Sequence, residues 1–283
     1  MQALLKLARP AALAAIVAMA GCIKQDQTFT VYPDGSGKIQ LSATVLPMVA
    51  QMMKAGEAQG RKGSGGDEMF KGLKQAFTNV YWANLQKSDG EDGSLTLSGT
   101  AYFEDINQVR AGGGGGMGGP PSEPKQLMTF RKDDGGDGHV LEVNGELLGG
   151  GNQLDNVPEE QVAQAKMMLQ GFESKVTVVM PGAVKSADPL KTSGREAVSH
   201  LTDKDIMDII DKKTTRPEKV IVVSGAPDDA ALAGEIETFK KELAEAKAAA
   251  EKDAGSAKKP EPKKGEKKDG EKKGGGEKKG QDF

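Results

Sequence analysis

Few side chains in this sequence could take part in chemistry. Its 283 residues include one cysteine, Cys22, and two histidines, His139 and His200. The motifs of a serine-hydrolase nucleophile, a paired-histidine zinc site and a phosphate-binding loop do not occur. His139 is expected at the start of a strand and His200 ahead of a helix, so we interpret both as surface residues rather than as a metal-binding pair. The sequence therefore predicts a protein that is not an enzyme and holds no cofactor or metal.

Two acidic, glycine-rich stretches could instead bind calcium. Residues 133–138 read Asp-Asp-Gly-Gly-Asp-Gly, and Asp89 to Asp92 is similar. A helix–loop–helix calcium site needs an acceptor side chain at its third position and a glutamate at its twelfth. Counting from Asp133, these positions hold Gly135 and Asn144. Because Asp and Gly are also the usual residues of hairpin turns, we interpret both stretches as turns.

Cys22 has a different chemistry open to it. It follows a short basic start and the apolar run 11–20, which is too short to cross a bilayer core of roughly 30 Å but suits a signal peptide. The preceding Met19-Ala20-Gly21 resembles the bacterial lipobox, in which the cysteine is lipidated and becomes the mature N-terminus. The alternatives are an ordinary secretory signal with a chance cysteine, and an uncleaved apolar N-terminus. A lone thiol is unusual in an exported protein, which favours lipidation.

This motif leads to predictions of processing and location. We expect a lipoprotein signal peptide over residues 1–21 and a lipid-anchored N-terminus, carrying palmitate-type chains, over 22–27. Ile23 stands where many bacteria with two membranes place an aspartate to retain a lipoprotein on the inner membrane. We therefore expect the cell envelope, with the outer membrane facing the periplasm where the organism has one.

Composition separates the last residues from the rest. Residues 258–283 contain ten lysines and six acidic residues, with no apolar side chain before Phe283. Residues 22–257 contain 26 Lys and Arg against 35 Asp and Glu, although the whole chain has a formal net charge of only −3. A segment with nothing apolar to bury cannot offset its ordering entropy, so we predict a disordered tail over 255–283. The tail is either a soluble spacer or a weak electrostatic contact to anionic polymers; specific nucleic-acid binding is disfavoured.

Alternating apolar residues around turn signals predict three hairpins, at 28–45, 80–103 and 126–148. Helices are expected at 47–57, 68–77, 158–172 and 202–212, and strands at 175–180 and 219–224. Successive hairpins do not make parallel crossovers. We therefore predict an α+β domain over 28–226, in which helices pack on one largely antiparallel, curved sheet.

Residues 227–254 are expected to form a separate helix. Its apolar residues follow heptad spacing, at Leu232, Ile236, Phe239, Leu243, Ala246 and Ala250. We refer to these six residues as the seam. The seam covers only about three heptads, which is near the minimum for a coiled coil. One interpretation is a single helix laid on the sheet or a semi-rigid spacer, and the other is self-association or partner binding through the seam.

Two segments resemble the bacterial LppM-like lipoprotein family. One is the hairpin from Phe29 to Lys38 with its Asp34-Gly35-Ser36-Gly37 turn, and the other is the segment from Val176 to Val184, in which a late strand ends in Pro181-Gly182. This resemblance covers about residues 25–225. It implies a fold similar to Bet v1-like or lipid-transfer proteins, with a curved sheet around an apolar pocket. Family members often carry an aromatic residue where this chain has Ser199-His200, so no pocket residue is transferred.

These observations lead to two expectations of function. The first is a non-enzymatic envelope lipoprotein that binds a lipid or another apolar ligand. The second is a structural or assembly module that holds a partner protein through the heptad helix and the basic tail. A set of methionines would suit an adaptable pocket lining, although it would suit a plain core equally; these are Met48, Met52, Met53, Met69, Met167 and Met168.

Overall fold

The computed structural model describes residues 23–58, 72–111, 124–148, 162–163, 166, 169–215 and 217–256. Its largest element is a seven-stranded sheet with the order β12-β13-β10-β1-β2-β5-β4. Only the central β1–β10 pair is parallel, and every other neighbouring pair is antiparallel. The strands are β1 (Ile23–Val31), β2 (Gly37–Val45), β4 (Tyr81–Asp89), β5 (Leu95–Phe103), β10 (Glu173–Val179), β12 (Lys191–Ser193) and β13 (Glu196–Thr202).

The two hairpins predicted for this sheet are present as β1–β2 and β4–β5. The first turn forms because the Asp34 Oδ1 atom accepts a hydrogen bond of 3.0 Å from the Ser36 amide, while Gly35 has a φ of 83° that favours glycine. Gly37 opens β2, where a Cβ atom would lie 1.9 Å from the Thr30 carbonyl oxygen. The glycines of this turn are therefore needed for conformation and for close approach.

A second, four-stranded sheet has the order β11-β14-β9-β8. It contains the third predicted hairpin, β8 (Met128–Lys132) with β9 (His139–Asn144), together with β11 (Gly182–Ser186) and β14 (Lys219–Pro227). Three short strands form a further small sheet: β3 (Phe77–Thr78), β6 (Arg110–Ala111) and β7 (Lys125–Gln126). The single-turn helix η1 (Ile106–Gln108) precedes β6.

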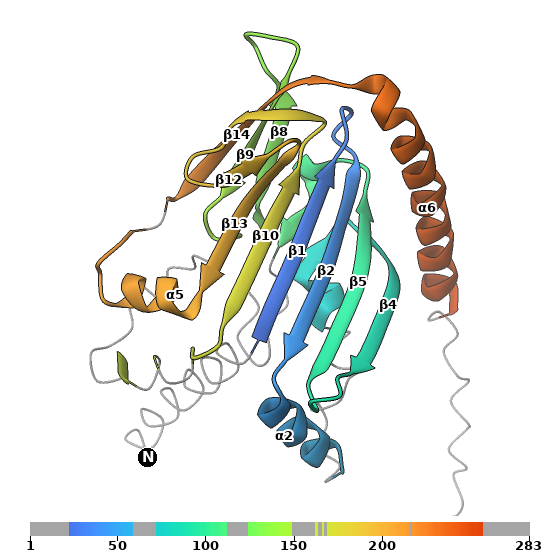
Figure 1. Ribbon diagram of the computed structural model, residues 1–283. Coiled ribbons are helices and arrows are strands. Elements are labelled where there is room, and N and C mark those ends of the chain that lie inside the picture. The colour runs from blue at the N-terminus through green and yellow to red at the C-terminus, as the bar shows by residue number, and fades with distance from the viewer. Residues whose placement is uncertain are drawn as a thin grey trace, which may run out of the picture.

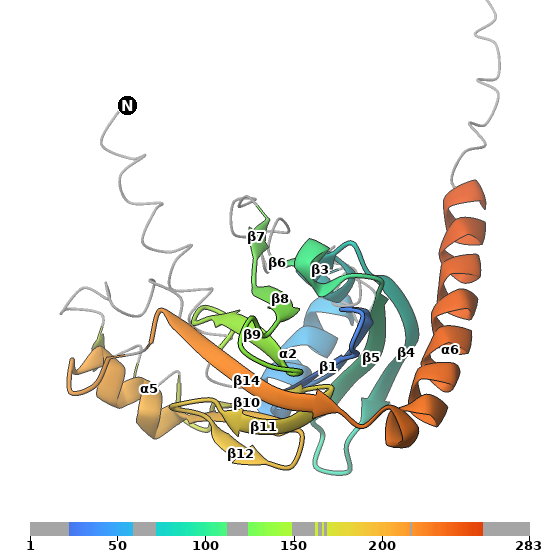
Figure 2. The same ribbon diagram turned by 90° about the horizontal axis from the view of Figure 1, so that it is seen from above.

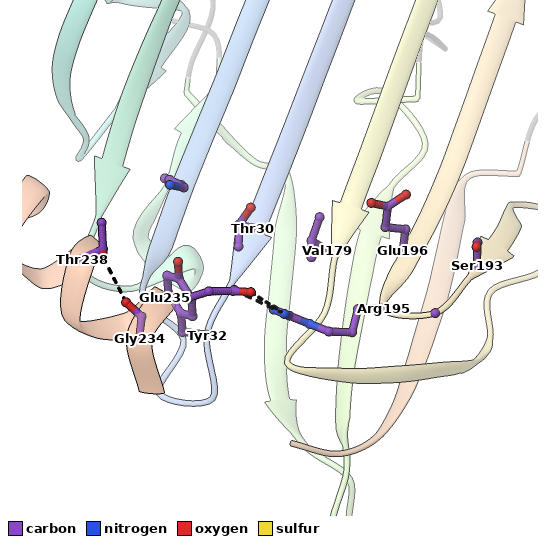
Figure 3. A pocket seen from close by; sticks show the side chains of 11 residues that line it. Thr30, Tyr32, Val179, Ser193, Arg195, Glu196, Gly234, Glu235 and Thr238 are labelled. Carbon is purple, nitrogen blue, oxygen red and sulfur yellow. Dashed lines mark hydrogen bonds and ion pairs between the residues drawn. The ribbon is translucent and has the colours of Figure 1, made fainter. Parts of the chain in front are cut away.

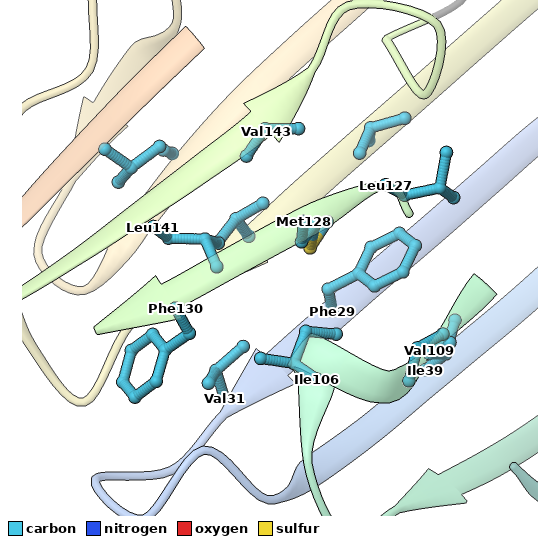
Figure 4. Close-up of a cluster of buried hydrophobic side chains, with 14 of the residues drawn as sticks. Phe29, Val31, Ile39, Ile106, Val109, Leu127, Met128, Phe130, Leu141 and Val143 are labelled. Carbon is cyan, nitrogen blue, oxygen red and sulfur yellow. The ribbon is translucent and has the colours of Figure 1, made fainter. Parts of the chain in front are cut away.

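The main core lies between the two larger sheets (Figure 4). Phe29, Val31 and Ile39 come from the seven-stranded sheet, and all three are at most 1% exposed. Leu141 and Val143 approach them from the four-stranded sheet and are fully buried. The predicted α+β class with mainly antiparallel strands is confirmed. The prediction of a single sheet covered by helices is wrong. The 126–148 hairpin pairs with β14 and not with the larger sheet, so a second sheet covers the core face of the larger one in addition to helices.

Three longer helices are described: α2 (Pro47–Ala58), α5 (Asp203–Ile210) and α6 (Asp229–Ser256). All three correspond to predicted helices. The predicted 68–77 helix is described only from residue 72; it is helical to residue 76 and then enters β3. Most of the predicted 158–172 helix lies outside the described residues, as does the predicted tail beyond residue 256. No helix in the described part of the chain is both long and apolar enough to cross a membrane.

Strands β11, β12 and β13 were not predicted from the sequence. All three residues of β12, Lys191 to Ser193, are exposed, so this edge strand shows no apolar alternation. In β13 only Ala197 is fully buried. Both strands are present because β10 offers a pairing edge to β13, which in turn pairs with β12.

The helix α6 lies on the face of the seven-stranded sheet opposite the main core, beside β4 (Figures 1 and 2). Its seam residues Leu232, Phe239 and Ala246 are at most 2% exposed, and Phe239 packs against Tyr32 and Tyr102. The ring centres of Phe239 and Tyr32 are 4.7 Å apart. Ile236 and Leu243 are half-buried and Ala250 is exposed, so the seam packs on the sheet over most of its length, as expected for a helix laid on the sheet.

We predict that Phe239→Ala lowers the free energy of unfolding by about 3 kcal/mol in urea titrations, because it empties a fully packed aromatic site. Ala250→Gln is the matched control. Ala250 belongs to the same heptad pattern but is exposed, so its replacement should change stability by less than about 0.5 kcal/mol. Equal effects of the two changes, or a Phe239→Ala effect on oligomeric state alone, would contradict this account of α6.

Candidate functional site

A groove of about 900 Å³ lies where the first turns of α6 meet the outer face of the seven-stranded sheet (Figure 3). Its walls come from segments far apart in the sequence: the ends of β1 and β2, the end of β10, the turn between β12 and β13, and α6. This volume is in the range of ordinary ligand sites. The residues that line it are Thr30, Tyr32, Lys38, Val179, Ser193, Gly194, Arg195, Glu196, Gly234, Glu235 and Thr238.

Arg195 joins the two sides of the groove. Its Nε atom donates to the Met180 carbonyl oxygen at 2.8 Å, and its Nη1 atom donates to both carboxylate oxygens of Glu235 at 3.1 and 3.2 Å. Its Nη2 atom is buried with no hydrogen-bond partner in the described part of the chain. Arg195 therefore connects the β12–β13 turn to the end of β10 and to α6.

Tyr32 closes the floor of the groove. It is 2% exposed, and burial raises the pKa of its hydroxyl to about 12, with a further contribution from the negative charge of Glu235. The hydroxyl is therefore protonated at neutral pH and is a hydrogen-bond donor rather than a base. Its ring packs on Phe239 and ties the floor to α6.

The charges of the groove balance one another. Lys38 and Arg195 are positive, while Glu196 and Glu235 are negative. Lys38 is also paired with Glu242 of α6 at 3.6 Å. Hydroxyl groups of three further residues are interspersed with these charges: Thr30, Ser193 and Thr238. A surface with donors and acceptors but no excess charge suits a ligand that is itself neutral and rich in hydroxyl groups.

A second hollow of about 510 Å³ continues the polar surface along the same sheet face. In its centre, Gln40 of β2 is paired with Thr28 of β1 and with Thr100 of β5. The adjoining row lies two residues after Thr28 on β1 and two residues before Gln40 on β2. It contains Thr30 and Lys38, which line the groove. Because side chains on one face of a strand repeat every second residue, the two hollows form one polar surface.

The described residues do not bring catalytic groups together. No group of three or more His, Cys, Asp or Glu side chains in the described ranges is placed to hold a metal ion. In the same part of the chain, no hydroxyl group of the groove hydrogen-bonds a histidine. The groove is lined mainly by polar and charged side chains.

The two acidic stretches are hairpin turns. The Asp92 Oδ1 atom accepts a hydrogen bond of 2.9 Å from the Ser94 amide, and the Asp133 Oδ1 atom accepts one of 3.2 Å from the Gly135 amide. Asp134 forms an ion pair with Arg131 at 3.2 Å. These carboxylates are therefore used by the turns themselves.

The two histidines lie in different surroundings. His200 is exposed, as predicted, and its Nε2 atom lies 2.9 Å from Glu173 Oε1. The prediction that His139 is a surface residue is wrong. It is 2% exposed and stacks on Phe130 with ring centres 5.0 Å apart. It is buried because the Asp133–Gly138 turn places it at the start of β9, between β8 and β14, where it pairs with Lys132 and Ser224.

None of the other sequence candidates is among the residues that line this groove. Cys22 lies outside the described residues. The side chains of Met52 and Met53, and all of Met69, Met167 and Met168, also lie outside them. Met48 is described and is 62% exposed rather than part of a pocket lining. Sequence reasoning missed Arg195 and Glu235, because their relation depends on β12, β13 and α6 meeting in space.

Comparison with solved structures gives a distant structural likeness. No family model matches the chain, and no curated protein matches it. The chain is similar to the folded domain of LppM from Mycobacterium tuberculosis, solved by NMR, with 13% sequence identity and a TM-score of 0.35. The alignment covers 74% of this chain and 93% of that domain. The expected resemblance is thus found as a distant structural likeness, and family membership stays a prediction.

We predict that stability falls as the pH drops below about 6.5, because the buried His139 resists protonation. Burial lowers the pKa of His139, and the positive charge of Lys132 lowers it further. The nearby Pro33 carbonyl raises this pKa only in part, because neither ring nitrogen forms a hydrogen bond in the described part of the chain. The unfolded chain therefore binds the proton more readily than the folded one between the lowered pKa and 6.5. Urea titrations from pH 7.5 to 5 would measure the loss.

His139→Phe preserves the stacked ring and removes both buried nitrogen atoms, so this variant should lose much less stability over that range. The window lies above the ordinary pKa values of aspartate and glutamate, which keeps their titration out of the comparison. An unchanged pH dependence in His139→Phe would contradict the assignment.

We also predict that Gly234→Ala stabilises the protein by about 0.5–1 kcal/mol, because glycine inside a helix is less favourable than alanine. Gly234 lies within α6, and a Cβ atom there would meet nothing within 4 Å. Thermal unfolding would measure the gain. Destabilisation would show that the space above Gly234 is not open.

Proposed function

We propose that this chain is a non-enzymatic lipoprotein of the bacterial envelope, anchored to a membrane through Cys22, whose domain binds a saccharide in the groove beneath the first turns of α6. The observation that carries the ligand class is the lining of the groove. Hydroxyl groups, balanced charges and open glycines surround a space of about 900 Å³. Sugar hydroxyl groups both donate and accept hydrogen bonds, which matches such a mixed lining.

The expectation of a wholly apolar ligand has less support than that of a polar one. Apolar side chains from the two larger sheets pack against one another in the main core, whereas the groove and the second hollow are lined mainly by polar residues. Among the described residues, only Met48 and Ile221 are large apolar side chains with high exposure, and neither lines the groove. We therefore assign the bound part of the ligand as a sugar, from either a free oligosaccharide or the head group of a glycolipid.

The alternative function is a module that holds a partner through the heptad helix, and a contact made by the buried seam residues would require α6 to leave its sheet. Leu232, Phe239 and Ala246 are already covered, so the seam cannot contact a partner while it packs on Tyr32 and Tyr102. A partner contact through the exposed side of α6 or the basic tail stays compatible with the groove and is secondary to this proposal.

We predict that neutral oligosaccharides bind the full-length protein and that Gly234→Trp abolishes this binding by placing an indole in the groove. Binding is measured by NMR titration or on a glycan array. Ala233→Trp is the matched control, because Ala233 is an exposed neighbour in α6 that does not line the groove. The control should bind as the unmodified chain does.

A comparison of free oligosaccharides with glycolipids in detergent micelles separates the two sources of the sugar. Binding that survives Gly234→Trp would place the ligand outside the groove. Tight binding of simple fatty acids or phospholipids without sugar would overturn the saccharide assignment in favour of an apolar ligand.

A further inference from the structure

The strand β1 begins directly after the proposed lipidation site. Ile23 is its first residue and already pairs with Val45 of β2. Lys24 pairs with Thr44 on one side and with Glu173 of β10 on the other. The strand is thus held between two neighbours from its second residue. A lipid on Cys22 would be separated from this rigid sheet by a single peptide bond.

We propose that the end of the domain at which β1 begins lies against the membrane surface, and that the groove faces away from the membrane. This inference rests on the proposed lipidation of Cys22. A lipidated residue lies at the membrane surface, and a tether of flexible residues would be needed for the domain to turn freely around it. With Ile23 already in the sheet, no such tether is present.

The same end of the sheet carries α2, the β4–β5 turn and α5 (Figure 1). Lys54 of α2 forms an ion pair of 2.8 Å with Asp89 at the β4–β5 turn. The Asp203 amide at the start of α5 donates to the Phe172 carbonyl oxygen, next to the first residue of β10. These contacts fix the helices to the strand ends, so the surface that meets the membrane is a built end of the domain.

Met48 supports a lipid bilayer as the occupant of this surface. It lies in the first turn of α2 and has the highest exposure, 62%, among the large apolar side chains described. Lys24 and Lys54 stand beside Glu173 and Asp89, so this end has no single sign of charge. The contact therefore depends on the anchor and on apolar insertion, and should be insensitive to anionic lipid content.

The length of β1 then sets the distance between the membrane surface and the groove. From Ile23 to Val31, eight steps of about 3.3 Å each make β1 about 26 Å long. The groove is at the far end of this strand, beside the β1–β2 turn and the start of α6 (Figure 1). A ligand would thus enter from the aqueous side, at a distance from the lipid surface that carries the anchor.

The test uses the full-length chain lipidated at Cys22, so that its only native thiol is blocked. Gln51→Cys introduces one label site on α2, and Ser193→Cys introduces one in the β12–β13 turn; both positions are exposed. Each variant carries the same environment-sensitive fluorophore in phosphatidylcholine vesicles that contain head-group spin-labelled lipid. We expect the quencher to reduce emission several-fold at position 51 and to leave position 193 nearly unchanged.

A flexible Gly/Ser insertion of twelve residues between Cys22 and Ile23 is the control. It allows a span of about 20 Å and should reduce the difference between the two labels. Equal quenching without the insertion, or stronger quenching at position 193, would overturn the orientation while leaving the anchor intact. Failure of the protein to float with the vesicles would overturn the anchor itself, and the orientation with it.

Discussion

The rest of the structure depends on the pairing of β1 with β2, because these two strands contribute side chains to both faces of the larger sheet. Inward-facing Phe29 and Ile39 enter the core between the two larger sheets, while the outward-facing Thr30 and Lys38 line the groove. Because side chains alternate along a strand, the same two strands supply both surfaces. A one-residue slip in their pairing would bury the polar row and expose the apolar one.

The cover on the outer face is only partial, and the groove exists at its boundary. The seam of α6 meets Tyr32 and Tyr102, and beyond them the sheet presents hydroxyl and amide side chains to water. Arg195 completes the wall by linking the β12–β13 turn to Glu235. An antiparallel sheet tolerates this division, because one of its faces can remain solvated while the other supports the core. A binding surface can therefore occupy the outer face without disturbing the main core.

Much of the fold could be predicted from local pattern, because hairpins depend on neighbouring residues. The Asp34-Gly35-Ser36-Gly37 turn and its flanking alternation specify β1–β2, and similar signals specify β4–β5 and β8–β9. The heptad spacing located α6 but could not identify its partner surface, since a seam packs equally well on a sheet or on another helix. His139 was misplaced because it directly follows the polar Asp133–Gly138 turn, whereas its burial comes from Phe130 and the distant strand β14.

The amino-acid sequence was enough to predict the three hairpins, the helices α2, α5 and α6, and a candidate anchor at Cys22. These features follow from residue type, spacing and turn chemistry over short stretches. Tertiary structure alone decided that the 126–148 hairpin joins a second sheet, that β12 and β13 extend the first one, and that Arg195 meets Glu235 across a groove. Such long-range pairings depend on which apolar faces bury each other most completely. The free energy of that burial comes from contacts across the whole core, so no single segment of the sequence specifies it.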